Sequence, residues 1–129
     1  MANSINAAQG IVSSSGTDGV GYAAGAGGTV TQATSKATGV TLNKICGEIT
    51  LNSAILNAGV IVSFVVTNSA VAAGDNIILN HSAVGTFGSY LLNARPAAGS
   101  FTVDVRNTSA ANLTEAIVIR FTVIKSVSA

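Results

Sequence analysis

The sequence predicts an all-β fold, a jelly-roll-like β-sandwich of about eight strands preceded by an extended N-terminal arm. Three observations lead to this prediction. Short runs rich in β-branched residues alternate with turn residues at intervals of about 8–12 positions, the spacing typical of sandwiches and barrels. No window of about a dozen residues carries apolar positions at a period of 3.6, so a long helix is not expected. The first part of the chain shows neither the β-rich runs nor a helical period.

Residues 1–28 are expected to form the arm. They hold seven glycines among many Ala, Ser and Asn residues, and glycine loses more conformational freedom than any other residue when it is ordered. The glycine cluster at 25–28 is expected to act as a flexible joint to a β-sandwich domain at 29–129. Isolated apolar side chains on such an arm are suited to anchoring on a neighbouring protein surface. The four candidates are Ile5, Ile11, Val12 and Tyr22.

The strands of the domain are expected from the alternation of apolar and polar residues. Over 101–106 the alternation is unbroken, which places Phe101 and Val105 on a core face and Asp104 and Arg106 on the opposite face. The two charged residues are expected to take part in cross-strand ion pairs. The expected strands cover 29–33, 38–42, 47–51, 60–68, 75–81, 88–95, 100–107 and 115–125.

Two further strands have a fully apolar face, and both faces are expected to point into the core. A buried aliphatic or aromatic side chain contributes about 1.5–3 kcal/mol, so these faces are a large part of the driving force for folding. They consist of Val60, Val62, Phe64 and Val66 in the first strand, and of Ile117, Ile119, Phe121 and Val123 in the second.

Two connections have the composition of hairpins. Residues 57–59 end in glycine just before a strong strand, and residues 96–99 begin with proline, which presets φ, and end in glycine. The segment 69–75 is expected to form a single helical turn that ends at Gly74.

The charge balance excludes several classes of partner. Charged residues make up 9% of the sequence, against roughly 25% in an average soluble domain. The six Lys and Arg residues are nearly balanced by five Asp and Glu residues and do not cluster, so there is no basic stripe for nucleic acid.

The longest apolar runs fall far short of the roughly 18 residues that a membrane span requires, and the start of the sequence lacks the pattern of a secretory signal. We therefore expect synthesis in the cytoplasm and no binding to nucleic acid or membrane.

Few residues are suited to catalysis. His81 and Cys46 are the single histidine and cysteine, so no metal set or internal disulfide is expected. His81 is expected to be structural or exposed at a strand end, and Cys46 to be a small buried apolar side chain. The Gly-x-Gly-x-x-Ala pattern at 19–24 lacks the strand and helix of a dinucleotide site. We expect no enzyme and no cofactor, since a small hydrolase would need a carboxylate and a nucleophile gathered around His81.

The composition also predicts an assembly. A chain with few charges and many β-branched residues leaves apolar area and sheet edges that must be covered. Winding eight strands into two sheets covers part of this surface, and packing subunits around a symmetry axis covers more. The chain is therefore expected to be a subunit whose arm reaches a neighbour.

The stretch at 19–43, GVGYAAGAGGTVTQATSKATGVTLN, resembles small virion structural proteins encoded by tailed bacteriophages and prophages. The resemblance continues through GEITLN at 47–52, VSFVVTNS at 62–69, AAGSFTVDVRN at 97–107 and EAIVIRFTVIK at 115–125. It covers about five sixths of the chain. Modules of this kind resemble head decoration (cement) proteins, and similar segments occur at the ends of tail-fibre-like proteins.

The resemblance implies a homotrimer on the outer surface of the virion head, where it clamps the major capsid protein. The arm would add a strand to a capsid subunit or thread beneath it. The alternative is a receptor- or glycan-binding module of a tail fibre or tailspike that contacts its target through loop 82–88. A chain that starts at its own Met1 and carries no shaft favours the head. The resemblance supplies no catalytic residue.

Overall fold

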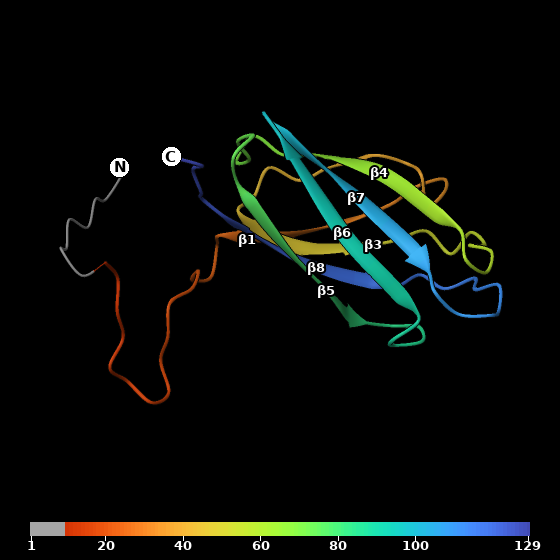
Figure 1. Ribbon diagram of the computed structural model, residues 1–129, viewed down its shortest axis with the longest axis horizontal. Helices are drawn as coiled ribbons and strands as arrows, with labels where there is room; N and C mark the ends of the chain where they lie inside the picture. Colours follow the sequence, from red (N-terminus) through yellow and green to blue (C-terminus); the bar gives the residue numbers. More distant parts are fainter. Residues whose placement is uncertain (1–9) are drawn as a thin grey trace.

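The computed structural model describes residues 10–129, and within them the body is all-β with no helix (Figure 1). No helix in this range is long and apolar enough to cross a bilayer. Two four-stranded sheets pack face to face, so the expected β-sandwich is confirmed. The strands are β1 (Gly27–Thr31), β2 (Val40–Thr41), β3 (Cys46–Thr50), β4 (Ile61–Thr67), β5 (Asn76–Ala83), β6 (Tyr90–Ala97), β7 (Ser100–Asn107) and β8 (Val118–Ile124).

The strand order is β1-β3-β8-β5 in the first sheet and β2-β4-β7-β6 in the second. From β3 to β6, consecutive strands alternate between the sheets. Strands β3 and β8 form an antiparallel pair in the first sheet, and β4 and β7, which lie between them in the sequence, form an antiparallel pair in the second. Next to these pairs, β5 is antiparallel to β8 and β6 is antiparallel to β7. This nested winding resembles a jelly roll. The short strands β1 and β2 add parallel edges.

The core lies between the two sheets and follows the predicted alternation. Phe101 from β7 and Phe121 from β8 are fully buried, with ring centroids 5.2 Å apart. Ile117 and its alternate neighbours on β8 are also buried, as expected. Val60 is an exception, because it lies in the turn that its amide closes on the Asn57 carbonyl, and its side chain is exposed. The inward face of β4 therefore begins at Val62.

The first strand begins two residues earlier than predicted, so Gly27 and Gly28 belong to β1 and not to a joint. They pair with Cys46 and Gly47 of β3. A Cβ atom on Gly47 would collide with the backbone oxygen of Gly28, so the close approach of these two strands requires glycine at that position.

Three connections differ from the expectation. The segment 69–75 is not helical but forms successive turns, closed by Val71 on Asn68 and by Asp75 on Ala72. Residues 57–59 lead from one sheet to the other, so they are not a hairpin, although Gly59 has the expected positive φ of 74°.

The hairpin at 96–99 exists, but its proline is not in the turn. Pro96 lies within β6 opposite Phe101, and Ala98 and Gly99 form the loop, with a φ of 77° at Gly99. Because β6 is an edge strand, a proline without an N–H group is tolerated there.

Candidate functional site

Residues 10–26 form an arm that projects from the start of β1 and contains no strand (Figure 1). Ile11 and Val12 lie on its projecting part and are 62% and 75% exposed, so the body does not cover them. Ile5 lies outside the described residues. Local hydrogen bonds shape the arm: the Ser13 hydroxyl donates to the Asp18 carbonyl oxygen at 2.8 Å, and the Ser15 hydroxyl donates to the Asp18 carboxylate at 3.1 Å.

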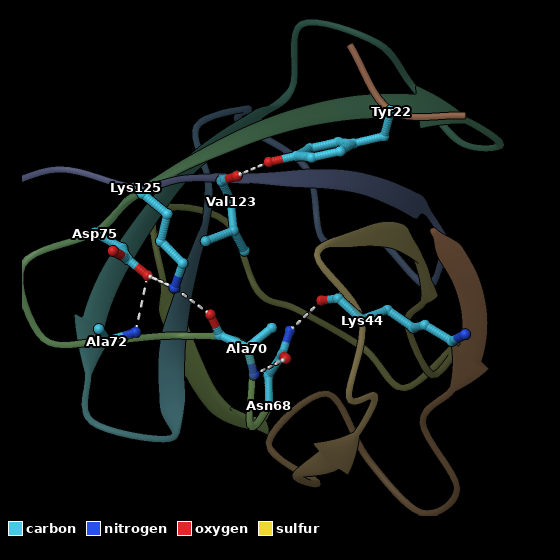
Figure 2. A network of polar contacts seen from close by, with 8 residues as sticks. All are labelled: Tyr22, Lys44, Asn68, Ala70, Ala72, Asp75, Val123 and Lys125. Atoms are coloured by element: carbon cyan, nitrogen blue, oxygen red, sulfur yellow. Dashed lines mark hydrogen bonds and ion pairs between the residues drawn. The ribbon is translucent and has the colours of Figure 1, made fainter. Parts of the chain in front are cut away.

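Tyr22 is the residue that ties the arm to its own body. Its hydroxyl donates to the carbonyl oxygen of Val123, near the end of β8, at 2.7 Å (Figure 2). The ring remains about half exposed. Of the predicted arm contacts, Tyr22 therefore lies at the base of the arm, while Ile11 and Val12 lie beyond it.

The region beneath Tyr22 is held by polar contacts between distant segments (Figure 2). The Lys125 ammonium donates to the Asp75 carboxylate at 2.7 Å and to the Ala70 carbonyl oxygen. The hydrogen bond from Lys125 holds the pKa of Asp75 below its ordinary value, and the Ala72 amide adds to the effect. The Asn68 amide donates to the Lys44 carbonyl oxygen at 2.7 Å. The arm thus starts from a braced end of the sandwich.

A groove of about 920 Å³ lies between residues 20–25 of the arm and the outer face of β3 and β8. Its floor carries an ion pair between Glu48 and Arg120, with an N–O distance of 2.8 Å. Cys46 also lines the groove and is half-buried, so the expectation of a buried apolar cysteine is wrong. Alternation along β3 explains this, because it turns Ile49 into the core and Cys46 outward.

The outer face of the second sheet is organised around Asp104. Its carboxylate accepts hydrogen bonds from Ser63 at 2.6 Å, from Asn93 at 3.1 Å and from both Nε and Nη2 of Arg95 at 2.9 Å. The Arg95 guanidinium in particular holds the pKa of Asp104 well below its ordinary value. The cross-strand ion pair expected of Asp104 is therefore present, with Arg95 as its partner.

Arg106 differs from the expectation, because within residues 10–129 no carboxylate lies close enough to pair with it. In the strand register it lies between Ile61 of β4 and Leu91 of β6, which are 57% and 58% exposed. These three residues, with Asn93 and Asp104, line a shallow hollow of about 380 Å³. The apolar stem of an arginine packs well along aliphatic neighbours, so the hollow combines one charge with apolar surface.

The loop at 82–88 has a defined shape. The Nε2 atom of His81 lies 2.6 Å from the Val84 carbonyl oxygen, and the imidazole lies against the exposed ring of Phe87, with centroids 4.4 Å apart and the ring planes tilted by 37°. Val84 has a φ of 59°, which a β-branched residue rarely adopts. His81 Nδ1 is buried without a hydrogen-bond partner among the described residues. His81 therefore has a structural role in supporting the loop.

Glu115 holds the loop from the other side. Its carboxylate accepts from the Thr86 amide at 2.9 Å, the Thr86 hydroxyl at 2.6 Å and the Tyr90 hydroxyl at 2.8 Å. The Thr86 hydrogen bonds in particular lower the pKa of Glu115, whereas burial and the carboxylate raise the pKa of Tyr90. All three donors serve to fasten the loop.

Lys36 was not singled out by the sequence, where it is one lysine in a polar stretch. Its residue is 3% exposed, and its ammonium donates to the carbonyl oxygens of Asn52 and Glu115. Burial lowers its pKa, and nearby Glu115 opposes that effect. Only the fold shows that this lysine joins two loops.

Within residues 10–129 no group of three or more His, Cys, Asp or Glu side chains is arranged to hold a metal ion. The glycine pattern at 19–24 lies in the arm, with no helix after it. The features left for interaction are the projecting arm, the groove beneath its base, the hollow at Arg106 and loop 82–88. Comparison of the chain with protein-family models, curated proteins and solved structures found no match.

Proposed function

We propose that this chain is a non-enzymatic decoration (cement) protein of a phage head, which binds the outer surface of the shell as a homotrimer and stabilises it. The observation that carries the proposal is the pairing of a braced β-body with a projecting arm whose Ile11 and Val12 are open to solvent. The resemblance of the sequence to phage head decoration proteins supports the same function.

The described contacts suit a clamp. The arm offers apolar side chains and unpaired backbone groups, which supply affinity for the major capsid protein without a reactive residue. Binding energy that exists only in the assembled shell opposes its opening by mass action. The Tyr22 hydrogen bond to Val123 ties the arm to β8, and the Asp75–Lys125 ion pair fixes the end of β8 to the turn before β5.

The low charge of the body supports a role in close packing. Arg95, Arg120 and Lys125 are each paired with a carboxylate of the same chain. A surface whose charges are already neutralised loses less solvation free energy when a neighbour covers it.

Loop 82–88 favours a second candidate function, that of a receptor- or glycan-binding module at a tail tip. Phe87 is exposed on this loop, and its ring packs against the His81 imidazole. Exposed aromatic rings on a shaped loop are suited to stacking on a ligand.

Location in the virion separates the two candidates. A tag fused after Ala129 and gold-labelled in electron micrographs is expected on the head; labelling of the tail would support the second candidate, and virions without label would overturn both. Heads made without the chain are expected to release DNA at a lower temperature than complete heads. Adding the purified protein to these heads should raise the release temperature to that of complete heads.

A matched pair of variants tests the arm itself. Ile11→Ser with Val12→Ser removes two exposed apolar side chains of the arm, and Val127→Ser changes an even more exposed residue near the other end of the chain. The arm variant should rescue such heads poorly and the control should rescue them fully. Equal rescue would exclude these arm residues as shell contacts.

A further inference from the structure

The ion pairs of the chain leave some charged side chains without an oppositely charged partner. All eleven Lys, Arg, Asp and Glu residues lie within the described residues, and three acid–base pairs form among them. Glu115 is satisfied by hydroxyl and amide donors, and Lys36 by carbonyl oxygens. Lys44 donates only to the carbonyl oxygen of Gly25, at the base of the arm, at 3.4 Å. Among the described residues, Asp18 on the arm therefore has no cation in an ion pair with it, and of the two remaining cations without a carboxylate, Arg106 is the one that lies in a hollow between exposed apolar side chains.

The surroundings of these two residues are complementary. Arg106 lies in the hollow on the outer face of the second sheet, between the exposed side chains of Ile61 and Leu91. Asp18 lies on the projecting part of the arm, joined by the serine hydrogen bonds to the segment that carries Ile11 and Val12. Each site therefore combines one unpaired charge with two exposed aliphatic side chains.

The arm cannot reach this hollow on its own body. Tyr22 holds the base of the arm on β8, in the first sheet, whereas Arg106 faces outward from the second sheet. From Tyr22 to Asp18 the chain spans at most about 14 Å when fully extended. The route must pass around a sheet edge and cross the roughly 10 Å between the sheets, with further distance along both outer faces. The Asp18 carboxylate therefore meets such a hollow only on another molecule.

We infer that the hollow around Arg106 receives the arm of a second copy of this chain, with Asp18 of one copy paired to Arg106 of the next and the arm segment around Asp18 packed on Ile61 and Leu91. Each copy offers an arm on one sheet and a hollow on the other, so the contact is head-to-tail, and in the proposed trimer three such contacts form a ring. The inference deepens the proposed function, because it assigns the contact that forms the trimer, but it does not depend on where the trimer binds.

Charge reversal in the purified full-length chain tests the pairing, with oligomeric state measured by sedimentation velocity and light scattering. The unmodified chain is expected to be a trimer. Asp18→Arg and Arg106→Asp each place like charges together and should weaken association by at least about tenfold. The combination of both should restore the trimer to near the original affinity. Arg120→Asp reverses an exposed arginine on the other sheet and should leave the trimer intact.

A second pair of variants tests the apolar part of the contact. Ile61→Ser with Leu91→Ser should dissociate the trimer. Ile78→Ser with Ile124→Ser, at residues 47% and 46% exposed on the first sheet, should not. Far-UV circular dichroism and melting temperature verify that each variant is folded.

Several outcomes would overturn the inference. They are a monomeric unmodified chain, single reversals that stay trimeric, or a double reversal that fails to recover. Hollow variants that remain trimeric but no longer bind heads would assign the hollow to the shell protein and exclude the arm. Gold labelling of the tail would refute the proposed location on the head, but it would not bear on the contact between the arm of one copy and the hollow of the next.

Discussion

The Tyr22 hydroxyl donates a 2.7 Å hydrogen bond to the carbonyl oxygen of Val123, a residue 101 positions further along the chain. Val123 is buried on β8, and its own amide donates to the Ile45 carbonyl oxygen at 2.8 Å. A single side chain of the arm is thereby joined to β8, one of the two inner strands of the first sheet. The direction in which the arm leaves the body depends on this contact.

Tyr22→Phe should loosen the arm without unfolding the body. The change removes one hydrogen bond, worth about 1 kcal/mol, and keeps the ring. Cleavage of residues 10–26 by a protease under native conditions is expected to accelerate several-fold, while the melting temperature stays within about 1 °C. Unchanged cleavage would mean that the hydroxyl does not hold the arm.

Two glycines in the same loop make a matched test of close packing. Gly85 and Gly88 both have a φ of 84°, so alanine at either position costs about 1 kcal/mol of backbone strain. A Cβ atom on Gly88 meets nothing within 4 Å, whereas one on Gly85 would lie 2.7 Å from both the Glu115 carboxylate and the Ile117 side chain. Gly85→Ala should therefore lose at least about 1 kcal/mol more than Gly88→Ala in urea denaturation. Equal losses would contradict the described loop.

Asn107 should be one of the costliest polar residues to truncate. It is fully buried, its amide donates to the carbonyl oxygens of Leu56 and Ala111, and its oxygen accepts from Ser109. Asn107→Ala removes all of these hydrogen bonds from a buried position. The Leu56 and Ala111 carbonyl oxygens keep one donor each, the Leu113 amide and the Ser109 hydroxyl, whereas the Ser109 amide loses its acceptor. A loss of about 2–3 kcal/mol in the free energy of unfolding is expected. Asn80→Ala, at an exposed position on β5, should stay within about 0.5 kcal/mol.

Acid should destabilise the fold through carboxylates that are hydrogen-bonded in it. The pKa values of Asp75, Asp104 and Glu115 are all lower in the folded state than in ordinary peptides. Such a group stabilises the fold above its unfolded pKa, about 4, and loses this contribution as the pH falls through its folded pKa. The free energy of unfolding should therefore decrease as the pH is lowered below about 4.

Glu115→Gln tests one member of this set. The variant lacks the titrating carboxylate, so its free energy of unfolding should fall less steeply below about pH 4 than that of the unmodified chain. Thr86→Val removes the hydroxyl donor that lowers the pKa of Glu115, and it should also reduce the slope. Parallel pH profiles for all three proteins would show that Glu115 does not couple to folding.

Sequence alone located the strands well. The prediction for 100–107 coincides with β7, and the remaining seven expected strands overlap the observed ones with ends that differ by a few residues. Alternation is a local signal, because successive side chains of a strand point to opposite faces whatever the strand pairs with. The same local pattern does not reveal which strands pair, which is why residues 57–59 have the composition of a hairpin although β3 and β4 lie in different sheets.

The candidate site was less accessible to prediction. The arm and its exposed residues Ile11 and Val12 follow from composition, but the anchoring of Tyr22 on β8 has no sequence signal. Asp104 was expected to pair across strands, yet the choice of Arg95 as partner, and the unpaired Arg106, depend on register. A shift of one residue would exchange the outward and inward faces.

By itself, the sequence determined the all-β class, the core-facing residues and a surface with few charges. These properties depend on residue type and on spacing between near neighbours. Tertiary structure alone decided which strands share a sheet, where the arm is attached and which charges meet. The physical reason is that an ion pair or a hydrogen bond requires atoms within about 3–4 Å, and for residues far apart in the chain only the packed fold brings them that close.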